Sequence, residues 1–154
     1  MDERRGTKDE EFMRMALELA REAGNADEAP VGAIVVIGDE VTGRGRNSPI
    51  AMSDPTAHAE ILALREASAA MGNYRLPGST MYATLEPCVM CAGALVAARV
   101  ERLVFGARDL RFGGVRSKFR IADSEVLNHR VEIVEGVLGA ECAELLKSFF
   151  EVRR

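Results

Sequence analysis

Residues 31–37 read Val-Gly-Ala-Ile-Val-Val-Ile, an almost uninterrupted apolar run. A strand without alternating polar positions is typical of a sheet that is covered on both faces. The Gly38-Asp39-Glu40 segment that follows is a short turn, so we expect a second strand near 41–46 to pair antiparallel with the first. The chain must therefore supply further elements to both sides of a sheet.

Helices and strands alternate along the rest of the chain. Apolar spacing predicts helices over 9–24, 58–72, 88–98 and 139–152, and strands at 80–84, 102–106 and 131–134. Pro87 suits the first turn of the helix at 88–98, because the N–H that proline lacks would be unpaired there. Residues 108–130, rich in glycine and charge, are expected to form a long loop. We predict an α/β fold, one domain over residues 1–154, with five strands and helices on both faces of the sheet.

Composition limits the class of protein. Hydrophobic residues make up 47% of the chain, enough for a compact core, and no apolar run is long enough to span a bilayer. The polar N-terminus does not resemble a secretory signal, so we expect a cytoplasmic protein with reduced thiols and no membrane attachment. The three cysteines, Cys88, Cys91 and Cys142, make a poor disulfide framework.

Two of these cysteines have the spacing of metal ligands. Cys88 and Cys91 are three residues apart at the start of the helix expected at 88–98, so their sulfur atoms face the same side. A helix N-terminus stabilises thiolates, the form that binds zinc, and His58 adds an imidazole nitrogen. Three protein ligands leave one position for water, which is the pattern of a catalytic zinc site. We expect one Zn²⁺ per subunit, although iron could occupy the same ligands in a mis-metallated preparation.

Glu60 is the expected proton carrier of this site. Residues two apart on a regular helix point to nearly opposite sides, so His58 and Glu60 can share a site only if His58 lies at the very start of the helix. Glu60 would then take a proton from the attacking water and deliver protons to a ring nitrogen and to leaving ammonia. One alternative is a structural zinc with Cys142 as its fourth ligand, but we favour a buried and inert Cys142. Another alternative is a zinc-stabilised binding module without activity.

The segments 54–60 and 84–91 contain the His-x-Glu and Pro-Cys-x-x-Cys pattern of zinc-dependent nucleobase deaminases. Over nearly its whole length the sequence resembles the cytidine deaminase-like superfamily, and within it the bacterial wobble-position tRNA adenosine deaminases. Further segments that carry the resemblance are 30–33, 46–50, 73–76, 92–93, 104–109, 128–132, 141–142, 149–150 and 153–154.

The resemblance implies a three-layer α/β/α fold with a five-stranded mixed sheet. It also implies a homodimer with the active site near the subunit interface, and conversion of adenosine to inosine in the anticodon stem-loop of tRNA. Asn47 would hydrogen-bond the flipped base, the backbone of Leu85 and Glu86 would line the base pocket, and Asp109 would lie near the substrate ribose. Phe149 and Phe150 would flank the RNA, or else pack in the core or the dimer interface. The basic residues expected to contact RNA are Arg111, Arg116, Lys118, Arg153 and Arg154.

Charge leaves the substrate class open. The net charge of −4 argues mildly against nucleic-acid binding, whereas segment 99–120 carries seven basic side chains against Glu101 and Asp109. That segment could be a phosphate-binding face or a solvated charged loop. The sequence also departs from the family: Arg116 takes the place of a glycine, Asp27 stands where a basic residue often occurs, and no basic tail follows Arg154. The alternative is therefore a deaminase of a free nucleobase or nucleoside, such as guanine, cytosine, adenine or a triazine-like ring.

Overall fold

The computed structural model describes residues 3–153, and its centre is a five-stranded sheet with strand order β2-β1-β3-β4-β5. β1 (Gly32–Ile37) pairs antiparallel with β2 (Glu40–Arg46) and with β3 (Ser79–Leu85). β3, β4 (Arg102–Ala107) and β5 (Glu132–Glu135) run parallel. The five strands, the antiparallel hairpin and the mixed sheet are confirmed.

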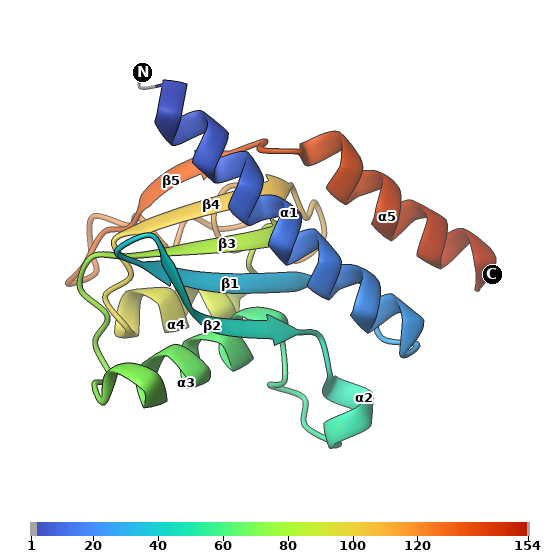
Figure 1. Cartoon of the computed structure of the whole chain (residues 1–154), viewed down its shortest axis with the longest axis horizontal. Helices are drawn as coiled ribbons and strands as arrows, with labels where there is room; N and C mark the ends of the chain where they lie inside the picture. Colours follow the sequence, from blue (N-terminus) through green and yellow to red (C-terminus); the bar gives the residue numbers. More distant parts are fainter. Residues whose placement is uncertain (1–2, 154) are drawn as a thin grey trace.

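Helices cover both faces of this sheet (Figure 1). α1 (Glu3–Asn25) and α5 (Gly139–Val152) lie on one face, and α3 (Ala59–Met71) and α4 (Val89–Ala97) lie on the other, so the three-layer α/β/α arrangement is confirmed. Sequence analysis missed α2 (Pro49–Met52), because four residues are too few to show a helical period. Within residues 3–153, no helix combines the length and the apolar character needed to cross a membrane.

The burial of β1 on both faces explains the apolar run at residues 31–37. Ala33 and Val35 pack in the cluster that includes α3 and α4, whereas Ile34 and Val36 pack in the cluster that includes α1. Successive side chains of a strand point to opposite faces, and here both faces are covered. Alternation is therefore absent from the sequence of β1, although its side chains alternate in space.

Two expected helix starts are wrong in detail. α1 begins at Glu3 rather than near residue 9, because charged residues with long side chains are good helix formers even where nothing packs on them. Pro87 lies before the helix instead of in its first turn, since Cys88 is the N-cap of α4 and has an extended backbone. The long segment 108–130 contains no helix or strand, as expected.

β2 holds α3 through two glycines. A Cβ atom on Gly45 would overlap the carbonyl oxygen of Ala59, and a Cβ on Gly43 would overlap the carbonyl oxygen of Ala63. The backbone of β2 therefore touches the backbone of α3 directly, which no larger residue would allow. This contact fixes the first turn of α3, where His58 and Glu60 lie.

A buried ion-pair network joins α1 to the sheet at the end away from those residues. Asp9 accepts hydrogen bonds from the Tyr82 hydroxyl at 2.7 Å and from Arg102 Nη1 at 2.8 Å. Asp9 and Arg102 are only 4% and 7% exposed. Arg102 was counted with the basic segment 99–120, but its side chain lies inside the protein and is not available to phosphate.

We expect Asp9→Asn to lower the free energy of unfolding by about 3 kcal/mol at neutral pH, because it removes the buried counter-charge of Arg102 and leaves only the half-exposed Glu132 at 3.5 Å. Burial alone would raise the pKa of Asp9, but the hydrogen bonds from Arg102 and Tyr82 outweigh it and hold that pKa below 3.8. A lowered native pKa adds stability above the ordinary carboxyl value, and that stability is lost as pH falls through the native value.

Urea unfolding of wild type and Asp9→Asn at several pH values measures this effect. The difference between the two proteins should be full at pH 7 and shrink below the ordinary carboxyl pKa. A difference that stays constant across this range would contradict the assignment. The proposed single domain predicts one cooperative transition in the same experiment.

Candidate active site

The three predicted metal ligands meet where α3 and α4 begin. His58 is the N-cap of α3 with ψ 151°, and Cys88 is the N-cap of α4 with ψ 178°. Both backbones are extended, so each side chain points away from the regular helix that follows it. Cys91 lies one turn into α4 and is completely buried. His58 thus lies at the very start of its helix, which is the condition for sharing a site with Glu60.

The distances between these atoms fit zinc. His58 Nδ1 lies 3.5 Å from Cys88 Sγ and 3.5 Å from Cys91 Sγ. A tetrahedral Zn²⁺ with bonds of about 2.3 Å to sulfur and about 2.0–2.1 Å to nitrogen separates sulfur from nitrogen by about 3.6 Å. Both nitrogen–sulfur separations are therefore already those that zinc requires, and all three ligand atoms lie within 4.8 Å of one another. No other group of three or more His, Cys, Asp or Glu side chains in residues 3–153 has its ligand atoms this close together.

Cys142 does not belong to this group. It is 1% exposed and packs in the apolar cluster beneath α1. Burial raises the pKa of its thiol to about 12, so Cys142 stays protonated at neutral pH. Cys142 is not among the side chains whose ligand atoms converge, so it is not a fourth zinc ligand, and its expected burial is confirmed.

The surroundings of Cys88 favour the thiolate form of its side chain, whereas the hydrogen bond to this thiolate raises the pKa of Cys91. A hydrogen bond with Cys91 is the largest effect, and with the hydrogen bond to His58 it outweighs burial and lowers the pKa of Cys88 to about 4. The position at the N-terminus of α4 favours negative charge in the same sense. Since thiolate is the form that binds metal, the site presents a ready zinc ligand.

Glu60 lies in the first turn of α3 and is 4% exposed. It lines the same pocket as His58 and Cys88. Burial raises the pKa of the Glu60 carboxyl to about 7. A group with a pKa near the operating pH is suited to both accepting and donating a proton. The position and the raised pKa of Glu60 fit a general acid and base, and this role stays a prediction.

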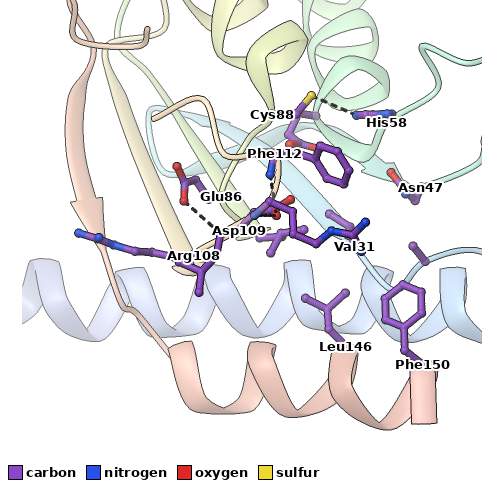
Figure 2. A pocket seen from close by; sticks show the side chains of 15 residues that line it. Val31, Asn47, His58, Glu86, Cys88, Arg108, Asp109, Phe112, Leu146 and Phe150 are labelled. Atoms are coloured by element: carbon purple, nitrogen blue, oxygen red, sulfur yellow. Dashed lines mark hydrogen bonds between the residues drawn. The ribbon is translucent and has the colours of Figure 1, made fainter. Parts of the chain in front are cut away.

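These groups lie at one side of a pocket of about 580 Å³. Figure 2 shows His58 and Cys88 on that side, with Leu146 and Phe150 projecting from α5 on the opposite side. The pocket also brings together the residues that were expected to contact the substrate, and its wall includes Asn47, Leu85, Glu86, Asp109 and Arg111.

Asn47 links the pocket to the metal site. Its side-chain oxygen accepts a hydrogen bond of 3.2 Å from the backbone N–H of Ala59, the first residue of α3. This bond caps the helix that carries Glu60. Because the side-chain oxygen of Asn47 is already bonded to Ala59, its NH₂ group is the part of the amide that can donate to a ligand. Contact of Asn47 with a base stays a prediction.

Sequence analysis missed several pocket-lining residues. They include Leu110 and Phe112, which are exposed in the loop after β4, whereas Phe150, expected to flank the RNA or to pack in the core or dimer interface, is half exposed on α5 and lines the pocket. Phe112 is 60% exposed, and the Arg111 guanidinium lies 5.2 Å from the centre of its ring. The sequence signal that could have identified Phe112 is a large aromatic residue within a charged loop. Exposing such a side chain to water is unfavourable unless it contacts a ligand or another molecule.

The predicted RNA contacts fall into two groups. Arg111 and Lys118 are exposed on the loop between β4 and β5. Arg116 is half-buried, and both ends of its guanidinium donate to Asp123 at 3.0 Å. In this chain Arg116 therefore braces the loop, and contact with RNA would require it to leave Asp123.

The C-terminal basic residues are only partly described. Arg153 lies over the Phe149 ring at 3.6 Å and donates to Asp27 at 2.7 Å, so the unusual acidic residue at position 27 anchors the end of α5. Arg154 lies outside the described residues. His129, in the loop before β5, bonds the Val100 carbonyl through Nε2 at 2.7 Å.

Comparison with known proteins agrees with this site. Residues 6–107 match the family described as the cytidine and deoxycytidylate deaminase zinc-binding region. The chain is 50% identical over 147 residues to a tRNA-specific adenosine deaminase of Haemophilus influenzae, covering 95% of this chain and 85% of the relative.

Solved structures add the shape of the fold. One similar structure has a TM-score of 0.85 and 43% identity, and the match covers 88% of this chain and 99% of that chain. It comes from biochemical and structural studies of A-to-I editing by tRNA:A34 deaminases at the wobble position of transfer RNA. A guanine deaminase from Nitrosomonas europaea has a TM-score of 0.78 and 28% identity, covering 91% of this chain and 83% of that chain.

Proposed function

The chain belongs to the cytidine and deoxycytidylate deaminase zinc-binding family, and we propose that it hydrolyses adenosine to inosine at the wobble position of tRNA. The observation that carries the reaction is the buried Glu60 beside three ligand atoms at the separations of tetrahedral zinc. The observation that favours this substrate is the near full-length similarity to tRNA-specific adenosine deaminases. Free-base deamination remains the alternative to be tested.

The reaction replaces the exocyclic amine with an oxygen atom. Bound Zn²⁺ supplies the Lewis acidity that makes water a nucleophile at neutral pH. Glu60 accepts one proton from the attacking water and gives it to the ring nitrogen. It then moves the second water proton to the departing amine, and the C–N bond breaks as ammonia leaves. The raised pKa of Glu60, about 7, supports both transfers.

The other residues of the pocket would hold the base. Asn47 can donate through its amide, and Leu85 supplies an apolar contact from the end of β3. Asp109 lies at the loop side, where the ribose of a flipped nucleotide would emerge. Bases of an anticodon loop can be splayed into such a pocket at low cost, because they are not paired in a duplex.

Two further statements belong to the proposal. The first is that the protein forms a homodimer, and light scattering of the purified protein tests it. It is supported by apolar side chains that stay exposed on α2 and α4, namely Ile50, Met52, Val89 and Met90. The protein acts in the cytoplasm, where the reducing environment keeps Cys88 and Cys91 free to bind zinc.

Ammonia release by the zinc-loaded protein tests the substrate directly. The protein is incubated in parallel with the tRNA pool of its organism and with a panel of free bases and nucleosides. We expect release from tRNA and conversion of adenosine 34 to inosine, read by sequencing the RNA. Release from a free base without tRNA activity would replace the proposal by the alternative.

We expect Phe112→Ala to raise the KM for an anticodon stem-loop RNA by about ten-fold, because stacking of a base on an aromatic ring contributes about 1–3 kcal/mol. Turnover of free adenosine, which has no flanking base, should change little. Steady-state kinetics on the two substrates measures the ratio.

Phe119→Ala is the matched control. Phe119 is 58% exposed on the same loop but does not line the pocket. It should therefore leave both KM values unchanged. An equal loss on RNA and on adenosine in the Phe112 variant would indicate a general distortion of the pocket and would contradict a stacking role.

A further inference from the structure

The loop after β4 is docked on the metal-binding end of α4. The backbone N–H of Gly114 donates to the Pro87 carbonyl at 2.8 Å, and Gly113 forms an isolated bridge with Cys88. A Cβ on Gly114 would lie 2.9 Å from the Cys88 backbone, and a Cβ on Gly113 would overlap the carboxylate of Glu86. The two glycines thus let the loop approach the zinc ligand and the residue before Pro87.

The carboxylate of Glu86 lies at the centre of this contact. It is 1% exposed, and it accepts hydrogen bonds from four backbone N–H groups of the loop. The donors are Asp109 at 3.1 Å, Val115 at 3.1 Å, Arg116 at 2.7 Å and Ser117 at 2.9 Å. The Ser117 hydroxyl donates a fifth bond at 2.5 Å. One side chain thus holds both ends of the segment 109–117.

The segment held in this way carries the pocket-facing residues of the loop. Asp109 Oδ1 accepts from the backbone N–H groups of Arg111 and Phe112, each at 3.1 Å, so Asp109 fixes the turn that presents the Phe112 ring. The dashed line that starts at Glu86 in Figure 2 marks the hydrogen bond from the backbone N–H of Asp109. A continuous set of hydrogen bonds therefore runs from the residue beside the metal-binding turn to the rim of the pocket.

Only an ionised carboxylate suits this place. Its two oxygens offer about four lone-pair sites and no donor, and all five of these bonds are donated to them by N–H or O–H groups. Glutamine would place an NH₂ group against at least one of these donors. The sequence-based expectation was that Glu86 acts through its backbone, whereas its side chain makes the larger set of contacts.

We propose that Glu86 is a positioning residue for the deaminase reaction, whose carboxylate sets the conformation of loop 109–117 and so places Asp109 and Phe112 against the RNA. The proposal rests on the proposed function for the identity of the substrate. Glu86 has no role in holding zinc or in moving protons. Arg116 reinforces the loop from its other side through Asp123.

The test is Glu86→Gln in the full-length, zinc-loaded protein, with three measurements. Zinc content should remain that of wild type. Hydrogen exchange at the amides of Val115, Arg116 and Ser117 should become faster by about ten-fold or more, because their acceptor is weakened. The KM for an anticodon stem-loop should rise by about ten-fold or more, with a smaller fall in kcat, because the substrate-facing loop is misplaced.

Two variants complete the design. Asp9→Asn also weakens a buried carboxylate network, but at the far end of the sheet, so it should lower stability without changing exchange at 115–117 or the KM. Ser117→Ala removes one of the five bonds and keeps the four backbone donors. It should fold normally and raise both the exchange rates and the KM by less than Glu86→Gln does, and it keeps the proposal testable if that variant does not fold.

Either of two results overturns the proposal. One is unchanged exchange at 115–117 and an unchanged KM in both Glu86→Gln and Ser117→Ala. The other is loss of zinc from Glu86→Gln, which would assign Glu86 to the metal site. Hydrogen exchange is measured without substrate. If the wild-type protein is inactive on tRNA, the proposed function is rejected, but the exchange rates still decide whether Glu86 holds the loop.

Discussion

Glu60→Gln should lower kcat for tRNA deamination by about 10³-fold, within the range of about 10²–10⁴ that general acid–base catalysis contributes. Glutamine has nearly the size of glutamate but cannot accept and return a proton. The pocket and the ligands would otherwise be unchanged, so the KM for RNA should stay close to that of wild type. Single-turnover kinetics with saturating enzyme separates the chemical step from binding.

Zinc content decides how such a loss is interpreted. Glu60 lines the pocket but is not among the three ligands, so the variant should hold as much zinc as wild type. Loss of zinc together with activity would make Glu60 a support of the metal site instead of a proton carrier. Retention of more than about a tenth of wild-type kcat would also contradict the assignment, because a single proton carrier contributes more than that.

The second large effect is expected at Cys91. Cys91→Ala removes a completely buried ligand, so the protein should lose most of its zinc and all measurable turnover. Zinc binds the folded chain, where the three ligands converge, much better than the unfolded chain. Its loss should therefore also lower the melting temperature. Metal analysis, activity and thermal unfolding measure the three consequences.

Cys142→Ala is the matched control, because Cys142 is the other buried cysteine and packs in an apolar cluster away from the metal ligands. It should cost some packing stability and keep zinc and activity. Treating wild type with a strong chelator should reproduce the Cys91→Ala phenotype, and added Zn²⁺ should reverse it in wild type alone. Full activity of the metal-free wild type would refute a role for zinc in the reaction.

The metal site could be predicted from the sequence because its ligands belong to two short segments, 54–60 and 84–91. Cys88 and Cys91 share one helical turn, so their convergence follows from local geometry. The pairing of His58 with Glu60 needed an irregular helix start, and the extended backbone at His58 meets that requirement. The sheet was equally predictable, since the apolar run at 31–37 requires cover on both faces.

Charge was a weaker guide. The seven basic residues of 99–120 suggested one surface, but the structure distributes them. Arg102 is buried against Asp9, Arg108 pairs with Glu135, and Arg116 pairs with Asp123. Partners of this kind lie far away in the sequence, so counting charges in a segment cannot identify which of them remain exposed.

The sequence by itself determined the order of the longer elements and the zinc ligand set, and it predicted Glu60 as the proton carrier, because periodicity and spacing within a few residues are local properties. Only the tertiary structure decided which side chains form the pocket and what the buried carboxylates do. Asp109, Arg116 and Ser117 reach Glu86 across more than twenty positions, and Phe150 reaches the pocket from the last helix. Contacts between distant segments arise when the layers pack, and no local pattern encodes their geometry.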